Sequence, residues 1–169
     1  MTVTAETSLR ATAGRLPTGV TVIGVAVDGE PHAMTANSFT TVSLDPPLVL
    51  VCVRRSGRMA GLLPRAGAFG VTVLPAGAAA VSHRFAAPDR PAGQAGFGPV
   101  GWHPAPATGS PVLDCGLAWF DCTVDTVLAA GDHDVCIGRV HACDHVSGGA
   151  PLVFAGGGYH GLVQAGRVP

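Results

Sequence analysis

The chain contains no lysine, and charged residues make up only 12% of the sequence. All ten basic residues are arginine, and the net charge is −1 at pH 7. A domain that binds nucleic acid normally carries a cluster of basic residues on one face. The one local concentration of positive charge is "RRSGR", residues 54–58, which suits a single phosphate better than a polyanion. The charge pattern therefore predicts no nucleic-acid partner.

The five cysteines lack the spacing of a zinc site or a redox motif. They stand at positions 52, 115, 122, 136 and 143, mostly in apolar stretches where a thiol packs as a small hydrophobic group. His141 and His145 are the rival candidates for a metal site. Their segment has the pattern of a strand, in which residues four apart are separated by about 13 Å. We therefore expect reduced thiols and no metal.

The sequence also lacks a long apolar run. Its N-terminal residues have no apolar core of the kind found in a signal peptide. The uncharged stretch 66–82 contains Gly70, Pro75 and Gly77, and it falls short of the roughly 20 apolar residues that a membrane-spanning helix needs. We expect a soluble, cytoplasmic protein with no membrane partner.

A chain of 169 residues has the length of one domain, since domains usually hold roughly 100–200 residues. No internal repeat is visible, so residues 1–169 are expected to form a single domain. Apolar residues make up 47% of the sequence, and few charges remain to cover the surface. This composition predicts that another subunit covers part of that surface, as in a homo-oligomer. The alternative is an Ala- and Gly-rich genome bias, since the chain has 24 glycines and no lysine.

Short β-branched stretches separated by turn residues dominate the chain, which predicts an all-β barrel or sandwich with a few short helices. Residues 1–15 are expected to form an N-terminal helix or arm, which ends before Pro17 and Gly19. Residues 87–112 are rich in proline and glycine and are predicted to form a long loop, with Phe97 and Trp102 packed against the body. Strands are expected over 20–27, 33–44, 47–53, 68–74, 115–131, 133–146 and 151–162, and helices over 57–67 and 76–86.

Four short motifs occur in the order "MTANSFT", "CVRRSGR", "SHRFA" and "AGDH". Together they resemble the short-chain flavin reductases, the NAD(P)H:flavin oxidoreductase components of two-component monooxygenases. The resemblance extends from "LPTGVTVIGV" to "GGGYHGL", which is nearly the whole chain. It implies an FMN-binding split barrel of Greek-key type that works as a homodimer, with the flavin near the subunit interface.

The resemblance places the flavin at the end of the strand that holds "MTANSFT". The isoalloxazine ring is flat and apolar, but its pyrimidine edge needs hydrogen bonds. The neutral side chains of Thr35, Asn37 and Ser38 suit that edge, and the backbone at Met34 and Ala36 can approach it closely. Ala33 stands where the family prefers glycine. A polar strand end that faces water is the alternative interpretation of these residues.

The resemblance also implies where the flavin phosphate and the nicotinamide bind. The phosphate is expected at the arginine-rich turn, because turns and helix N-termini that offer amides, a hydroxyl and guanidinium groups bind anions. The alternative is that the three arginines are only solvated. His133 is expected beside the flavin as the catalytic residue that holds the nicotinamide, or it merely fills its turn. Phe85 lies near the flavin or fills the core. The further residues assigned to the flavin are Cys52, Val53, Arg54, Arg55, Ser56 and Arg58, and those assigned to the nucleotide are Asp132 and Tyr159.

The expected function is a flavin reductase. It transfers hydride from NADH, with NADPH as second choice, to FMN or FAD, and releases the reduced flavin to a partner monooxygenase. The sequence leaves open which flavin is preferred and which of the arginines in 54–58 contacts the phosphate. Two alternatives are an oxidase that keeps its flavin tightly bound, like the pyridoxamine-phosphate oxidases, and a non-catalytic flavin-binding protein.

Overall fold

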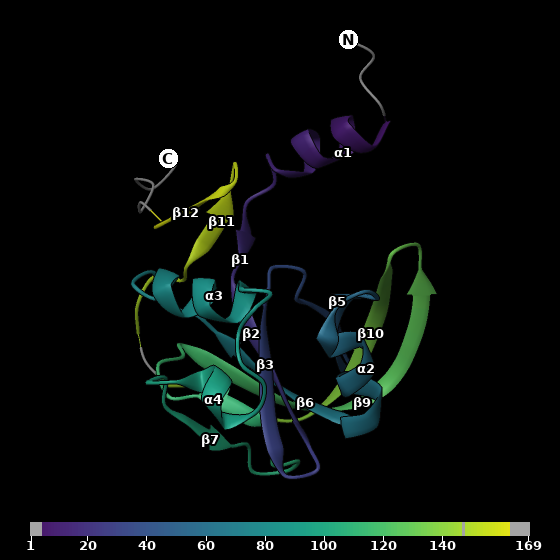
Figure 1. Ribbon diagram of the computed structural model, residues 1–169, viewed down its shortest axis with the longest axis vertical. Helices are drawn as coiled ribbons and strands as arrows, with labels where there is room; N and C mark the ends of the chain where they lie inside the picture. The colour runs from purple at the N-terminus through teal and green to yellow at the C-terminus, as the bar shows by residue number, and fades with distance from the viewer. Residues whose placement is uncertain (1–4, 147, 163–169) are drawn as a thin grey trace.

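A computed structural model describes residues 5–146 and 148–162 of the chain (Figure 1). Its main element is an antiparallel sheet of seven strands in the order β3-β2-β6-β9-β10-β5-β4. These strands are β2 (Thr21–Val27), β3 (Glu30–Ala36), β4 (Thr40–Leu44), β5 (Pro47–Arg54), β6 (Ala68–Val73), β9 (Ala118–Ala130) and β10 (His133–His145). The prediction of one strand over 33–44 was wrong, because residues 37–39 divide that segment between the two edge strands of the sheet.

Smaller elements surround this sheet. The helices are α1 (Ala5–Ala13), α2 (Arg58–Ala66), α3 (Ala79–Ala86) and α4 (Gln94–Phe97). Strands β1 (Thr18–Gly19), β11 (Val153–Ala155) and β12 (Gly158–His160) form a small sheet, and β7 (Trp102–Pro104) pairs with β8 (Pro111–Leu113). The predicted helices over 57–67 and 76–86 correspond to α2 and α3. None of the helices in the described ranges is long and apolar enough to cross a membrane.

The sheet is strongly curled, because its two edge strands follow one another in the chain. Only residues 37–39 connect the end of β3 to the start of β4, and an extended chain spans at most about 3.6 Å per residue. The opposite edges must therefore come close together at this corner. Ser38 joins them: its Oγ donates to the carbonyl oxygen of Cys52 on β5 (3.1 Å) and accepts from the Cys52 amide (3.0 Å). The sheet is curled but not closed, and the all-β, split-barrel prediction is confirmed.

The core occupies the inside of the curled sheet. Along β5, Val49, Val51 and Val53 are buried and alternate with half-exposed neighbours, as expected for a strand with one face toward the core. Leu63 of α2 is fully buried in the same cluster. A second cluster of buried apolar residues lies under α3 and includes Phe85.

The segment 87–112 is not one long loop, because it contains α4, β7 and β8. Phe97 is buried, with its ring centroid 5.2 Å from that of Phe85 and 5.5 Å from that of Trp102, so the expected packing of Phe97 and Trp102 is confirmed. Strand β8 crosses β2 and β6 where Gly24 pairs with Gly70. A Cβ atom at Gly24 would lie 2.2 Å from the carbonyl oxygen of Pro111, so only glycine permits this crossing.

The Ser38 link predicts a stability effect. Replacing Ser38 by Ala removes two hydrogen bonds and leaves backbone groups of Cys52 without these partners, which should lower the free energy of unfolding by about 1–3 kcal/mol. Urea unfolding measures this loss. Thr41→Ala, on the exposed edge strand β4, serves as the control. Equal stability of the two variants would contradict the proposed role of Ser38 in holding the sheet edges together.

Candidate functional site

A cavity of ≈ 420 Å³ lies between β3, β5, α2 and α3, and we call it the α2–α3 cavity. Its walls come from segments that are far apart in the sequence, and the curl of the sheet brings them together. The residues predicted from sequence that line it are Met34, Thr35, Val53, Arg54, Ser56, Arg58 and Phe85. Phe85 is 1% exposed and packs on Phe97, so it fills the core and also forms part of the cavity wall.

One end of the cavity is formed by the N-terminus of α2. The helix begins at Arg58, directly after Ser56 and Gly57, so its first backbone amides and the positive end of its dipole lie at this turn. Helix N-termini of this kind attract phosphate groups. The predicted phosphate site and the helix that would support it therefore coincide in the structure.

Two arginines at this end of the cavity face carbonyl groups. Arg58 donates to the carbonyl oxygens of Arg90 (3.1 Å) and Pro91 (3.5 Å). Arg90 donates to those of Ala33 and Ala87, both at 2.9 Å. Neither guanidinium forms an ion pair with a carboxylate of a described residue. Their positive charge is therefore available to an anion in the cavity.

This unbalanced charge acts on neighbouring titratable groups. Burial lowers the pKa of Arg90, and the positive charge of Arg58 lowers it further. The pKa of His32 is lowered in the same way, first by burial and then by Arg58. An anion bound between Arg58 and Arg90 would offset this repulsion. The sequence analysis missed Arg90, because a single arginine in a Pro-rich segment carries no recognisable motif.

Three other predicted residues do not line the α2–α3 cavity. Arg55 faces Asp134 of β10, with 3.5 Å between Nε and Oδ1. Cys52 lies on the half-exposed outer face of β5, and Ala36 is buried in the core. Among the arginines of the turn, only Arg54 and Arg58 line the cavity. The assignment of Arg55, Cys52 and Ala36 to the flavin rests on the resemblance alone.

A smaller cavity of ≈ 170 Å³ also adjoins Thr35, and we call it the β12 cavity. Asn37 and Tyr159 line it together with Thr35. The Tyr159 hydroxyl lies 2.7 Å from Oγ of the buried Ser82, and the Thr35 hydroxyl donates to the Ser82 carbonyl oxygen at 2.6 Å. Because its proton is used in this way, Thr35 offers a ligand only an acceptor.

The neutral side chains of Thr35, Asn37 and Ser38, which were expected to line one site, therefore lie in different places. Thr35 lines both cavities and Asn37 lines the β12 cavity, whereas the hydroxyl of Ser38 is occupied by the backbone of β5. Asn37 is exposed and forms no hydrogen bond through its side chain to another described residue. Of the three side chains, Asn37 keeps both its donor and its acceptor for a ligand, and Ser38 has a structural role that the sequence analysis missed.

His133 lies at the start of β10, beside the arginine-rich turn. It pairs with Arg54 across the sheet, and the Arg55 amide donates to the carbonyl oxygen of Asp132 (3.0 Å). His133 Nδ1 is 2.8 Å from Asp132 Oδ1, and this hydrogen bond lowers the pKa of Asp132. A carboxylate only accepts, so Nδ1 carries the proton, and Nε2 is the acceptor in the neutral ring. The imidazole borders the turn and does not line the α2–α3 cavity.

Comparison with known proteins identifies the family. Residues 13–163 match the model of the flavin reductase like domain. The chain belongs to this family. It is 38% identical over 149 residues to the NADH-dependent FAD reductase of Streptomyces globisporus, a match that covers 88% of this chain and 81% of the relative. It is 36% identical to HsaB of Rhodococcus jostii, the reductase subunit of a flavin-dependent monooxygenase, over 95% of this chain and 80% of the relative.

Solved structures agree with this assignment. BorF, the flavin reductase component of a bacterial two-component tryptophan halogenase, is 42% identical with a TM-score of 0.88, and the match covers 95% of this chain and 99% of BorF. A probable flavin reductase of Rhizobium meliloti is longer: at 41% identity, the match covers 95% of this chain but 50% of that protein. The family that the four motifs indicated is thus confirmed.

The two cavity arginines predict a selective loss of phosphate binding. Arg58→Ala should weaken FMN binding about tenfold or more, because a hydrogen bond to a charged group contributes about 1.5–3 kcal/mol. Riboflavin, which has no phosphate, should lose about twofold or less. Fluorescence titration measures both affinities, and Arg65→Ala, an arginine paired with Asp28 outside this cavity, is the matched control. Equal losses for FMN and riboflavin would remove Arg58 from the phosphate site.

Proposed function

We propose that the protein is an NADH-dependent flavin reductase that reduces FMN or FAD and releases the reduced flavin to a partner flavin-dependent monooxygenase. NADPH is the second-choice donor. The observation that carries the proposal is the α2–α3 cavity, with uncharged walls along β3. At one end it has a helix N-terminus and two arginines that pair with no carboxylate among the described residues. Such a cavity suits a planar ring system that ends in a phosphate. Among the relatives named above, one is an NADH-dependent FAD reductase, one is the reductase subunit of a flavin-dependent monooxygenase and one is the flavin reductase component of a halogenase.

The flavin, when bound, supplies the ring that accepts hydride, and the chain's own residues position it. Arg58 and the amides at the start of α2 hold the phosphate, and Val53 and Phe85 offer apolar surface. Thr35 offers an acceptor of fixed direction, because Ser82 holds its proton. Alignment of two reactants at about 3–3.5 Å supplies much of the acceleration in such a reaction, so no acid–base residue is needed.

A direct assay separates this function from its alternatives. Purified protein, free FMN or FAD and NADH should give a loss of absorbance at 340 nm that depends on added flavin. A tightly bound oxidase would retain flavin through purification and show no such dependence. A non-catalytic binding protein would bind flavin without oxidising NADH. Either of these results would overturn the proposal.

His133 is proposed to orient the nicotinamide through Nε2, because Nδ1 is held by Asp132. His133→Ala should raise the KM for NADH and leave flavin affinity near that of the wild type. Because no proton moves, kcat should fall by less than the 10²–10⁴-fold that is typical for a lost acid–base group. Steady-state kinetics and thermal unfolding are measured on the same variant. Normal NADH kinetics with reduced stability would show that His133 only fills its turn.

We also infer that two copies pair through the outer face of the sheet. Residues directly opposite one another on adjacent strands share a face, and Cys52, Val135 and Leu128 form one such row, with Leu50 and Ile137 beside it. These side chains are half-exposed or exposed, so they form an apolar surface of a kind that commonly marks an interface.

The free state of all five cysteines is in keeping with the reducing cytoplasm, where we place the protein.

Light scattering tests the dimer. The wild type should have about twice the mass of one chain, and Leu50→Asp should shift it toward the monomer, because a charge would be buried in the interface. Val146→Asp, which alters an exposed apolar residue outside this row, should remain a dimer. A monomeric wild type at micromolar concentration would contradict the interface.

A further inference from the structure

His32 of β3 has no role in the function proposed above, although it lies next to the phosphate end of the α2–α3 cavity. It does not line that cavity. It lines a gap of ≈ 10 Å³ beside it, together with Arg58 and Arg90. A gap of this size holds at most about one water molecule, so it leaves no room for a ligand. His32 can therefore act on a bound flavin only through its neighbours.

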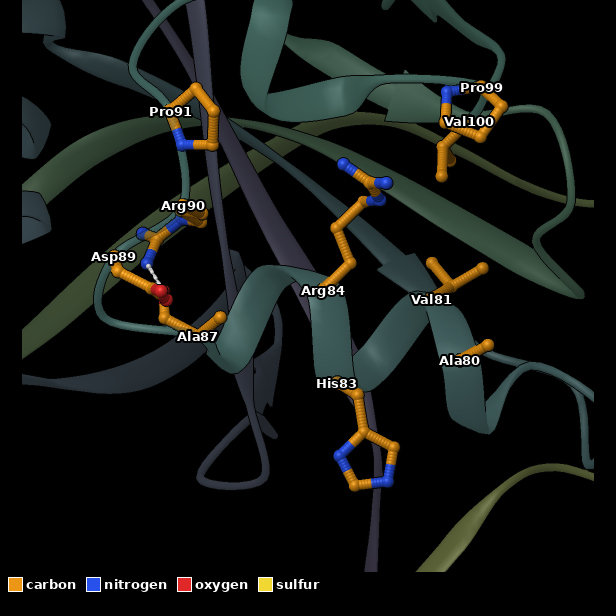
Figure 2. Close-up of a pocket in the computed structure, with 10 residues that line it drawn as sticks. All are labelled: Ala80, Val81, His83, Arg84, Ala87, Asp89, Arg90, Pro91, Pro99 and Val100. Atoms are coloured by element: carbon orange, nitrogen blue, oxygen red, sulfur yellow. Dashed lines mark hydrogen bonds between the residues drawn. The ribbon is translucent and has the colours of Figure 1, made fainter.

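The two arginines are held by the chain segment that follows α3. Figure 2 shows Arg90 and Pro91 in this segment, with Arg90 bonded back to the Ala87 carbonyl oxygen. Arg58 donates to the carbonyl oxygens of Arg90 and Pro91, and Nε of Arg90 donates to that of Ala33 on β3. The positions of both guanidinium groups therefore depend on how this segment lies against β3.

His32 forms another contact between β3 and this segment. The Gly93 amide donates to Nδ1 of His32 over 3.5 Å. A nitrogen that accepts carries no proton, so the neutral ring is protonated at Nε2. A hydrogen bond of this length is weak, so its loss alone would have a small effect. The charge of the ring matters more, because a protonated His32 would be a third cation beside Arg58 and Arg90.

The charged groups around His32 disfavour that proton while no anion is bound. Burial lowers the pKa of His32, and the positive charge of Arg58 lowers it further. Arg90 and Arg65 act in the same direction, whereas the carboxylate of Glu30 raises the pKa. A phosphate bound between Arg58 and Arg90 would offset the charge of these two arginines and so favour a protonated ring.

His32 also reaches solvent through a separate hollow. This hollow has a volume of ≈ 440 Å³, and His32 lines it together with Gly93 and the exposed Glu30. It has no lining residue in common with the α2–α3 cavity. The ring can therefore exchange a proton with water while a flavin occupies the cavity.

We propose that His32 is a positioning residue for the flavin phosphate: it takes up a proton when the phosphate binds between Arg58 and Arg90, so that flavin affinity rises as the pH falls below neutrality. The proton comes from solvent and binds to Nδ1, and the weak hydrogen bond from Gly93 is lost. Because the phosphate favours the proton, the proton favours the phosphate by the same factor. The proposal rests on the function above, since it requires a flavin phosphate at the start of α2.

The test is the pH dependence of flavin affinity in the wild type and in His32→Asn. Asparagine keeps an acceptor for the Gly93 amide but does not titrate. FAD is the probe, because neither of its phosphates has a second ionisation, whereas the phosphate of FMN titrates at about pH 6. Riboflavin, which has no phosphate, is the control ligand. The matched control variant is His103→Asn, because His103 is paired with Asp114 and lines none of these hollows.

Fluorescence titration gives Kd between about pH 8 and about pH 5, the range in which histidine titrates. Over this range, the FAD affinity of the wild type and of His103→Asn should rise about threefold or more relative to that of His32→Asn, the effect of one partly screened charge. Riboflavin affinity should show no such difference. Parallel pH profiles for FAD in the wild type and His32→Asn would overturn the proposal and leave the proposed function intact.

Calorimetry on the wild type tests the proposal even where His32→Asn is unstable. Titrations at about pH 6 in buffers of different ionisation enthalpy count the protons that accompany binding. Binding of FAD should take up protons, and binding of riboflavin should take up fewer. Equal proton uptake for the two ligands would contradict the proposal. Failure of FAD, FMN and riboflavin to bind at all would instead refute the proposed function, and this proposal with it.

Discussion

The short connection between opposite edges of the sheet governs the rest of the molecule. Because three residues take the chain from β3 to β4, the sheet must curl until its edges approach. Ser38 fixes that approach by bonding to both backbone groups of Cys52. The curl places the end of β3 opposite the end of β5, and α2 and α3 then enclose the space between them. The α2–α3 cavity thus follows from the constraint that shapes the sheet.

The two arginines that line the α2–α3 cavity have carbonyl groups as partners, which is unusual for arginine. Exposed guanidiniums commonly pair with carboxylates, as Arg65 does with Asp28. Arg58 and Arg90 instead donate to carbonyl oxygens, which fix their positions without neutralising them. The cavity keeps its positive charge for a ligand.

Hydrogen bonds also connect the C-terminal part of the chain to the cavity. Ser82 on α3 bonds to Tyr159 through its side chain and to Thr35 through its carbonyl. The small sheet of β1, β11 and β12 is thereby connected to the strand that lines the cavity. Because the Ser82 carbonyl oxygen accepts the hydroxyl proton of Thr35, Thr35 can offer a ligand only a hydrogen-bond acceptor. Selectivity at this position thus depends on a residue about fifty positions away in the sequence.

The sequence by itself determined the fold class, most strand and helix positions and the family. Local periodicity and the four motifs carry that information, and the match over residues 13–163 agrees with it. The sequence also identified the arginine-rich turn, because several guanidiniums in one short segment form a recognisable pattern. Phe97 and Trp102 in the Pro/Gly-rich segment 87–112 indicated that this segment packs against the rest of the molecule, as the structure confirms.

Only the tertiary structure decided which of these side chains face the cavity. Arg55 forms an ion pair with Asp134 of β10, and Ser38 forms hydrogen bonds with the backbone of β5. Both partners lie on strands that are distant in the sequence, so neither side chain faces the α2–α3 cavity. Arg90 gained its position because α4 and the β7–β8 hairpin anchor its segment against the core. Local sequence patterns record which residues can bind a ligand. The direction in which each side chain points depends on long-range packing, which a local pattern does not contain.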